Sequence, residues 1–334
     1  MPKRKLRPVL DGDWWLIGPS PDLSGLVPGA DEHRAAWAAD GKKGEHNAPV
    51  DHHAFQGPDG AWHLWGCVRA TAVGRVFYHW EAAALTDSPW RATGEVIRRD
   101  RDAGECVDDW GGQEWLQSPY FVRHDGTYHM FYGGHLSAFP RDATDLAVGD
   151  AARACQICLM TSPDGRNWTR HRDADGLSQL FRGPGETRDP CVIRVDGTWY
   201  LYYAGHYDPD TPDEGAGFVV RTSDDLVHWS DWRLVHRDAR FGKGRCEAEC
   251  PHVVFRDGYF YMFRTQDYYA ARTHVFRSED PYDFGIGDAG DKYVGVFPAA
   301  AVEIYADGSG NEYVSSNHAP RLGTQMCRLK WEAA

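Results

Sequence analysis

The sequence contains no long hydrophobic run. No stretch of about 18 or more apolar residues occurs anywhere in the 334 residues, and a membrane-spanning helix needs about that length. The opening residues, MPKRKLRPVLDGDWW, carry basic side chains but lack the apolar core that defines a signal peptide. We therefore expect no membrane partner and a cytoplasmic location.

Positive charge is in the minority. The chain has 36 Lys and Arg residues against 49 Asp and Glu residues, which gives a net charge of −13. Because nucleic-acid backbones attract basic surfaces, this balance argues against a nucleic-acid partner. It leaves the oligomeric state unknown.

Helical periodicity and metal-binding cysteine motifs are also scarce. Few stretches repeat their apolar residues every 3.6 positions, so we expect very little helix. The eight cysteines are scattered, and the C-x-x-C pair Cys155 and Cys158 falls in the apolar stretch ARACQICLMTS. A single such pair is a weak zinc signal, so these two are expected to be buried, reduced thiols.

What the sequence does contain is an internal repeat. Five segments share the pattern of apolar strand, Asp-Gly turn and aromatic strand. They are DHHAFQGPDGAWHLWG, SPYFVRHDGTYHMFYGG, RDPCVIRVDGTWYLYYAG, ECPHVVFRDGYFYMFRT and, more loosely, AAAVEIYADGSGNEYVSS. Asp-Gly between alternating apolar runs predicts a β-hairpin, because glycine accepts the positive φ of the turn.

A second turn motif follows the hairpin, as in TSPDGRNW and TSDDLVHW, so each unit is predicted to have four strands. Five such units predict an all-β chain folded as a single five-bladed β-propeller over residues 1–334. The blades are expected at roughly 46–95, 114–172, 186–236, 247–290 and 295–330, with the N-terminal DGDWWLIGPS closing the ring. A β-sandwich is the alternative, but it does not require this repetition.

Acidic side chains stand at the strand starts of three units. They are Asp51, nine residues before Gly60, Asp189, eight before Gly197, and Glu249, nine before Gly258. The second unit has Gln117 and Ser118 at this place, and the fifth has only alanines, Ala299–Ala301. Because a propeller brings these strand starts to one end of its central channel, we expect the three carboxylates to converge on one pocket beside Arg188.

The motifs RDP at 188–190 and ECP at 249–251 stand at matching places in consecutive repeats. In this the chain resembles the five-bladed propeller glycoside hydrolases, namely the invertase and levansucrase families 32 and 68 and the related arabinanase and xylosidase family 43. The resemblance implies that Asp51 is the nucleophile or base, that Asp189 stabilises the transition state and that Glu249 is the acid.

The first repeat departs from the invertase pattern, because HNAPVDHHAF stands where that group has Trp-Met-Asn-Asp-Pro-Asn-Gly. Glu45, Asp108 and Asp109 therefore remain alternatives to Asp51. Some related propellers use a histidine as the acid, which makes His52 an alternative in that role.

Further residues are candidates for contacts with substrate. They are Arg188, Gln117, His52, Trp115, His135, His206 and Tyr268. No cofactor is expected to be required, but the resemblance to family 43 implies a structural divalent cation, such as calcium, in the central channel. His318 is the candidate ligand.

The predicted function is hydrolysis of a terminal sugar, of the furanoside or xyloside class, from an oligosaccharide or glycan. Two alternatives remain: a glycoside phosphorylase or transglycosylase, and a non-catalytic sugar-binding propeller. A lectin repeats its binding residues in each blade, whereas this chain varies them from unit to unit, which favours one asymmetric active site. The sequence leaves retention or inversion of the anomeric centre open.

Overall fold

The computed structural model describes residues 3–23, 25, 49–71, 73–105, 114–135, 155–185, 187–206, 215–318 and 323–334. Within these ranges regular structure is almost entirely β-strand, apart from single 3₁₀ turns such as Arg101–Ala103, Ala239–Phe241 and Arg245–Glu247. The predicted all-β class is confirmed. In this described part, no helix has the length and apolarity needed to cross a membrane.

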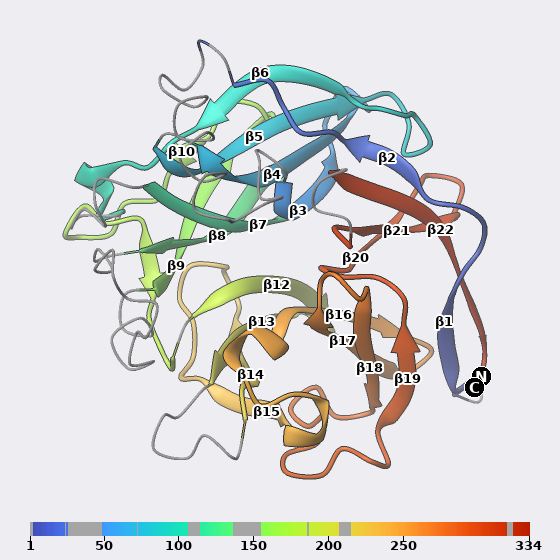
Figure 1. The fold of residues 1–334 in the computed structure, drawn as a ribbon. Helices are drawn as coiled ribbons and strands as arrows, with labels where there is room; N and C mark the ends of the chain where they lie inside the picture. Colours follow the sequence, from blue (N-terminus) through green and yellow to red (C-terminus); the bar gives the residue numbers. More distant parts are fainter. Residues whose placement is uncertain are drawn as a thin grey trace, which may run out of the picture.

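The first half of the chain forms a nine-stranded sheet (Figure 1). Its strands are β3 (Pro49–Gln56), β4 (Trp62–Thr71), β5 (Gly74–Ala82), β6 (Arg91–Ile97), β7 (Glu114–His124), β8 (Thr127–His135), β9 (Cys155–Ser162), β10 (Thr169–Arg170) and β11 (Gln179–Phe181). Neighbours pair antiparallel except at one place, where β5 and β7 pair in parallel through Gly74 with Glu114 and Arg75 with Trp115. Cys155 and Cys158 are buried in β9, as expected.

Two four-stranded antiparallel sheets follow. They consist of β12 (Arg188–Val195), β13 (Thr198–His206), β14 (Gly217–Ser223) and β15 (Arg233–Arg237), then β16 (Glu249–Arg256), β17 (Tyr259–Asp267), β18 (Arg272–Ser278) and β19 (Tyr293–Phe297). Residues from 295 onward were expected to begin the fifth unit, and this boundary is wrong. Strand β19 pairs with β18 from Thr273–Phe297 to Phe276–Tyr293 and therefore belongs to the fourth unit.

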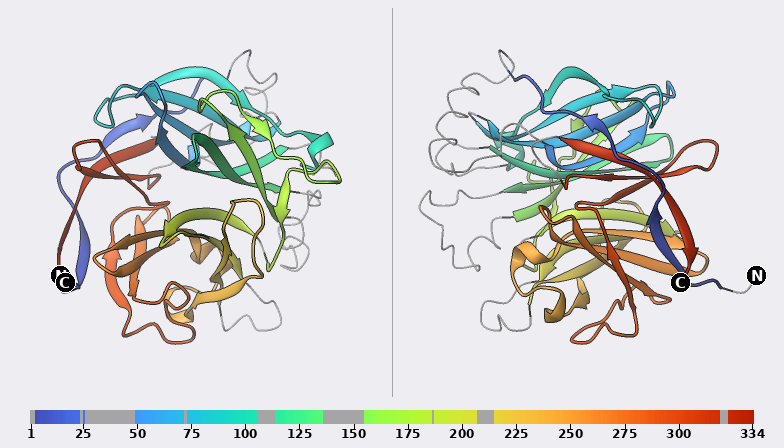
Figure 2. Two further views of the ribbon diagram at one scale, coloured as in Figure 1. Left: turned by 180° about the vertical axis from the view of Figure 1, so that it is seen from behind. Right: turned by 45° about the vertical axis from the view of Figure 1, so that its right-hand side comes forward.

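The last sheet joins the two ends of the chain. It contains β20 (Glu303–Ala306), β21 (Glu312–Ser316) and β22 (Thr324–Ala333), and both β1 (Leu6–Leu10) and β2 (Trp15–Gly18) pair with β22. Strand β1 and the end of β22, near the two ends of the chain, consequently lie side by side (Figure 1). In the views of Figure 2, β20–β22 lie between the β3–β6 and β16–β19 strands.

Strand β2 also reaches the first sheet. The backbone N–H of Trp90 donates to the carbonyl of Ile17 at 3.0 Å, and the Ser88 hydroxyl donates to the carbonyl of Leu16 at 2.8 Å. The segment DGDWWLIGPS thus links the last sheet to the first.

The hairpin turns follow the Asp-Gly prediction in the middle units. Asp125-Gly126, Asp196-Gly197 and Asp257-Gly258 all have positive φ at both residues, which is the type I′ arrangement that matches the twist of paired strands. The first and fifth turns are longer than the two residues predicted. They span Gly57–Ala61 and Asp307–Asn311, where the outer residues bond to each other through the backbone.

Apolar packing lies between neighbouring sheets rather than in one central core. Four separate clusters of buried side chains fill these spaces. One of them unites Ile17 of β2 with Leu64 and Trp80 of the first sheet and Met326 of β22. Strands β3, β7, β12 and β16 each open one of the repeated units. They contact each other in turn, and β20 contacts β3. This arrangement brings the strand starts together.

We expect Ile17→Ala to lower the free energy of unfolding by about 2–5 kcal/mol, because it opens a cavity at a fully buried contact between the first and last sheets. Urea unfolding followed by tryptophan fluorescence measures this. Val296→Ala is the control, since Val296 is 58% exposed and should change stability by less than about 0.5 kcal/mol. Equal effects of the two substitutions would contradict this account of the packing.

Candidate active site

A pocket opens where the first strands meet. Its lining comprises Asp51, His52, Ser118, Pro119, Asp189, Pro190, Cys250, Pro251, Ala301 and Glu303. These residues come from β3, β7, β12, β16 and the start of the last sheet. Because each strand contributes different side chains, the pocket is chemically asymmetric.

The backbone of these strand starts is distorted in a repeated way. Strands β3, β7, β12 and β16 all break their regular pairing with the next strand near their first residues. Ser118, Asp189 and Cys250 have φ of 53°, 59° and 48°, and each is followed by a proline. Positive φ in non-glycine residues costs of order 1–3 kcal/mol and clusters at functional sites. This backbone sets the direction of the residues that line the pocket.

The structure brings the three predicted carboxylates together. Ser118 Oγ lies 2.6 Å from Asp189 Oδ1 and 3.1 Å from Asp51 Oδ2, so this hydroxyl bridges the two acids. It carries one hydrogen and donates to one carboxylate at a time. Asp51 and Asp189 are only 8% and 5% exposed, so their carboxylates are largely removed from water.

Arg188 joins the third acid to this group. Its Nη1 donates to Asp189 Oδ2 at 2.9 Å and to Glu249 Oε1 at 2.8 Å. The backbone N–H of Cys250 adds a hydrogen bond to Asp189 Oδ2 at 3.1 Å. Asp189 is therefore held from three sides, by a hydroxyl, a guanidinium and a backbone amide.

The surroundings raise the pKa of two of these acids. Desolvation by burial is the main reason why the pKa of Glu249 rises from 4.5 to about 7. The charge of Arg188 opposes this rise in pKa, and the negative charges of Asp189 and Asp51 add to it. Burial also raises the pKa of Asp51, followed by repulsion from Asp189. A carboxyl with a pKa near neutrality can donate a proton at physiological pH.

Tyr268 is also at the site, as predicted. Its hydroxyl donates to Asp51 Oδ1 at 3.2 Å and lies 2.8 Å from Cys250 Sγ. Burial raises the pKa of both this phenol and the Cys250 thiol, so both groups stay protonated. Asp51 can accordingly accept hydrogen bonds from Ser118 and Tyr268.

Gln117 and Trp115 lie beside the pocket and contact each other. Trp115 Nε1 donates to Gln117 Oε1 at 3.1 Å, and the Arg75 guanidinium donates to the same oxygen at 2.5 Å. The guanidinium also lies over the Trp115 ring, 3.9 Å from its centre. These contacts fix both side chains in place.

His52 lines the pocket, but its ring nitrogens contact the last sheet. Nε2 lies 2.5 Å from Ser315 Oγ, and Nδ1 lies 3.0 Å from Asn317 Nδ2. Burial lowers the pKa of His52 to about 3. A ring held neutral in this way lacks the acidic second proton of an imidazolium, so the alternative role of His52 as the acid is not supported by its environment.

Several sequence candidates have side chains outside the described part of the structure. His135 and His206 end strands β8 and β13, but their side chains are not described. Glu45, Asp108 and Asp109 lie wholly outside the described residues.

The sequence analysis missed Glu303. The fifth unit was expected to bring only alanines, but Glu303 lines the pocket beside Ala301. Its Oε2 is 2.9 Å from His252 Nδ1, and burial raises its pKa. Counting back from Gly308 misled the prediction, because the fifth turn continues to Asn311 and its positive-φ glycine is Gly310.

His318 is the predicted metal ligand. Its Nδ1 lies 2.9 Å from Ser316 Oγ, and its ring packs on Trp14 with 4.8 Å between centres. Two groups of three metal-ligating side chains occur among the described residues, and His318 belongs to neither. Its role as a calcium ligand stays a prediction.

The chain is similar in sequence to an arabinan-acting enzyme and in fold to family-43 glycoside hydrolases. It is 24% identical over 184 residues to the probable arabinan endo-1,5-alpha-L-arabinosidase C of Aspergillus fumigatus, a match that covers 55% of this chain and 50% of that protein. The chain thus spans about half the length of the curated relative it matches. A scan against protein-family profiles finds no match.

Solved structures of family-43 glycoside hydrolases share the fold. An alpha-L-arabinofuranosidase from Lactobacillus brevis superposes with a TM-score of 0.57 at 13% identity, over 84% of this chain and 90% of that one. A GH43_1 enzyme from Xanthomonas citri superposes with a TM-score of 0.56 at 14% identity, over 85% of this chain and 87% of that one. An exo-1,5-alpha-L-arabinanase from a bovine ruminal metagenomic library superposes with a TM-score of 0.54 at 17% identity, over 86% of this chain and 93% of that one. The resemblance to family-43 glycoside hydrolases that the motifs predicted is therefore confirmed at the level of the fold.

The raised pKa of Glu249 makes stability depend on pH. Its folded-state pKa of about 7 exceeds the ordinary 4.5, so the folded protein binds more protons between these values. The contribution of Glu249 is complete below pH 4.5 and is lost as the pH rises through 7. Glu249→Gln stays neutral, so its stability relative to the wild type should rise over this range by up to about 3 kcal/mol.

Urea unfolding at a series of pH values measures this difference. Glu247→Gln is the matched control, because Glu247 lies two residues away and accepts backbone N–H groups of Lys243 and Gly244 in a loop. It shows how stability responds to the loss of a neighbouring carboxyl over the same pH series. A Glu249→Gln difference that is constant with pH would show that the carboxyl has an ordinary pKa.

Proposed function

We propose that the chain is a glycoside hydrolase built as a single five-bladed β-propeller over residues 1–334. The strand groups β3–β6, β7–β11, β12–β15, β16–β19 and β20–β22 supply the five blades, and β1 and β2 complete the last one. The short parallel pairing of β5 with β7 merges the first two blades into one sheet.

The observation that carries the proposal is the meeting of three acids from three different strand groups: Asp51 and Asp189 line the pocket, and Glu249 is joined to Asp189 through Arg188. Asp51 and Asp189 share the Ser118 hydroxyl, and Asp189 and Glu249 share the Arg188 guanidinium. Cleavage of a glycosidic bond needs one protonated carboxyl and one ionised carboxylate on either side of the bond. The raised pKa of Glu249 supports its role as the acid.

The other two roles follow from the contacts. Asp51 accepts hydrogen bonds from neutral hydroxyls, and its raised pKa makes it a stronger base or nucleophile once ionised. Asp189 is paired with Arg188 and a backbone amide, which suits hydrogen bonding to a sugar hydroxyl and to developing positive charge. Arg188 positions both Asp189 and Glu249. These acids perform both proton transfers themselves, so the proposal needs no cofactor.

The substrate class follows from the names of the similar proteins, which include arabinanases, an arabinofuranosidase and a beta-xylosidase. We propose a terminal arabinofuranosyl or xylosyl unit of an oligosaccharide or glycan. Action at the chain end suits a single pocket built from strand starts. The cytoplasmic location stays a prediction.

The alternative reaction, phosphorolysis, requires basic groups for phosphate beside the acid. Arg264 lies in the strand after Glu249, but its guanidinium donates to the carbonyls of Glu247 and Gly242 and is fully buried. A sugar-binding propeller without catalysis is the other alternative, and it gives no reason for a carboxyl with a pKa of about 7.

Glu249→Gln should lower kcat on an unactivated arabinoside or xyloside by about 10²–10⁴-fold, because the leaving oxygen no longer receives a proton. On a 2,4-dinitrophenyl glycoside the leaving group needs no proton, so the loss should be much smaller. Asp51→Asn should hydrolyse both substrates slowly. Initial rates over a panel of arabinosides, xylosides, fructosides and galactosides, with and without phosphate, measure these effects.

Glu247→Gln serves as the control and should hydrolyse the panel at the wild-type rate. Full activity of Glu249→Gln on the unactivated substrate would remove Glu249 from the acid role. A rate that depends on phosphate would identify a phosphorylase. If the wild type hydrolysed none of these sugars, a sugar-binding propeller without catalysis would be favoured.

The pH profile of kcat/KM should follow the protonation of Glu249. Only the protonated carboxyl donates, so the rate should fall as the pH rises through about 7, tenfold for each further unit. Stopped assays between pH 4 and 9 on the unactivated substrate measure it, and this alkaline limb should disappear with the dinitrophenyl substrate. An alkaline limb common to both substrates would point to a group other than the acid.

A further inference from the structure

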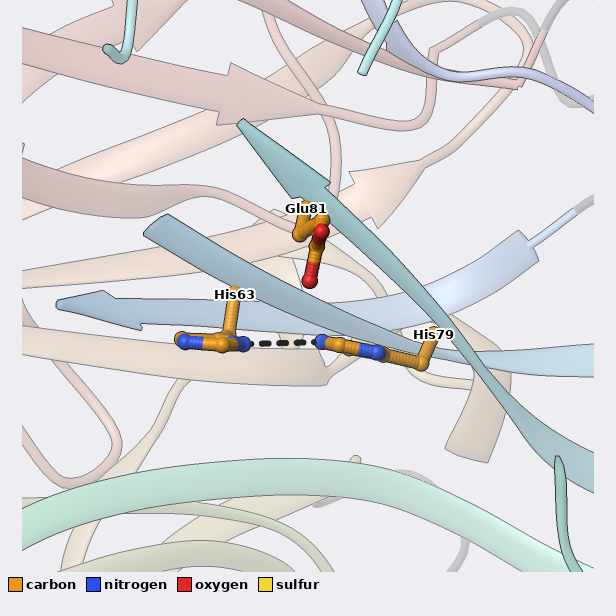
Figure 3. A group of neighbouring side chains, drawn as sticks. All are labelled: His63, His79 and Glu81. Carbon is orange, nitrogen blue, oxygen red and sulfur yellow. Dashed lines mark hydrogen bonds between the residues drawn. The ribbon is translucent and has the colours of Figure 1, made fainter. Parts of the chain in front are cut away.

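A second cluster of titratable side chains lies in the first sheet, outside the pocket. His63 on β4 and His79 on β5 face each other with Nδ1 of His63 and Nε2 of His79 3.0 Å apart (Figure 3). The two rings are within 9° of parallel, and both side chains are fully buried. Buried imidazoles placed so close need a proton or a cation between them.

The outer nitrogens of the pair face carboxylates. His79 Nδ1 is 3.1 Å from Glu95 Oε2 and 3.1 Å from Thr93 Oγ1. His63 Nε2 is 3.7 Å from Asp59 Oδ1 and makes no hydrogen bond with any described residue. A line of four groups therefore runs from one surface carboxylate through both rings to another.

Two neutral rings cannot donate to each other and to both outer carboxylates. When His79 donates to His63 and His63 donates toward Asp59, His79 Nδ1 accepts from the Thr93 hydroxyl and turns its lone pair toward Glu95. Each neutral imidazole carries one N–H. If His79 donates to Glu95, its Nε2 accepts the N–H of His63, and His63 Nε2 then turns a bare lone pair toward Asp59. If both rings instead donate outward, two lone pairs face each other at 3.0 Å.

A third ligand lies across the pair. Glu81 is the direct cross-strand neighbour of His63, and Figure 3 shows its carboxylate pointing toward the space between the two rings. Arg91 and Arg166 pair with this carboxylate. Three carboxylates, those of Asp59, Glu81 and Glu95, against two guanidiniums leave the surroundings with a net negative charge.

We propose that His63, His79 and Glu81 form a zinc site that ties β4 to β5. Zinc is bound by imidazole nitrogens at about 2.0–2.1 Å, and two such ligands in a tetrahedral site lie about 3.3 Å apart, close to the separation of these two nitrogens. The ion lies off the line between the rings, toward Glu81, and a water completes the set. Both outer N–H groups then donate to Asp59 and Glu95, the carboxylate–histidine–zinc arrangement.

The turn before His63 is shaped to the site. A Cβ on residue 57 would lie 2.6 Å from His63 Nε2 and 2.8 Å from Asp59 Oδ1, so only glycine lets this turn pack on the ring. The side chains of Asp59 and Glu95 are 48% and 43% exposed, which leaves a path from solvent. The ion would hold the 57–61 turn and two strands together.

The experiment uses the full chain without an affinity tag, stripped with a chelator and titrated with Zn²⁺ by calorimetry. We expect one equivalent to bind and the melting temperature to rise. His79→Gln should remove this binding, and Glu95→Gln should weaken it about 10–100-fold through loss of an outer partner. His129→Gln is the matched control, since His129 occupies the same place, three residues after its turn glycine, in the next hairpin. It should bind zinc as the wild type does.

Zinc K-edge X-ray absorption on the unmutated protein reports the ligands even if a variant folds poorly, and nitrogen and oxygen neighbours without sulfur are expected. A sulfur neighbour, or binding lost in Cys250→Ser and kept in His79→Gln, would place the ion at Asp51, Asp189 and Cys250 instead and overturn the proposal. Absence of binding at micromolar zinc would also overturn it. The inference is independent of the proposed hydrolysis, which zinc at the histidine pair should leave unchanged.

Discussion

The pocket depends on one electrostatic constraint: three carboxylates are buried close together, and two of them share the Arg188 guanidinium. Asp51, Asp189 and Glu249 meet where water is largely excluded, and Arg188 is the cation that contacts two of them. Buried charges are costly unless they are paired and hydrogen-bonded. The Ser118 and Tyr268 hydroxyls and the Cys250 amide supply the remaining hydrogen bonds. The starts of β7, β12 and β16 thus supply Ser118, Arg188 and the Cys250 amide, which stabilise the buried charges.

The same constraint explains the strained backbone. The left-handed conformation of Ser118 and Asp189 brings hydroxyl and carboxylate within 2.6 Å, and that of Cys250 accompanies the contact of its N–H with Asp189. Each of these residues precedes a proline, which lacks an N–H that the irregular pairing would leave unsatisfied. The strained backbone conformation persists because the sheets behind the pocket are closely packed on four apolar clusters, whose burial offsets its cost.

The sequence predicted those features that repeat locally. Asp-Gly turns and alternating apolar residues identify hairpins without knowledge of the rest of the chain, and counting back from the turn found Asp51, Asp189 and Glu249. Counting failed where the turn changes length, and so Glu303 was missed. It also could not predict the partners of His52, because Ser315 and Asn317 are 263 and 265 residues away and meet it only when the last sheet packs on the first. The histidine pair went unnoticed for a related reason, since His63 and His79 become neighbours only through the pairing of β4 with β5.

Arg188 also links two acids whose other contacts differ. A single atom, Nη1, contacts both Asp189 and Glu249, so the two carboxylates share one positive charge. Asp189 has the further support of Ser118 and the Cys250 amide, whereas Glu249 has neither. Burial raises the pKa of Glu249 to about 7, so this carboxyl can hold a proton near neutral pH, as acid-catalysed cleavage of a glycosidic bond requires.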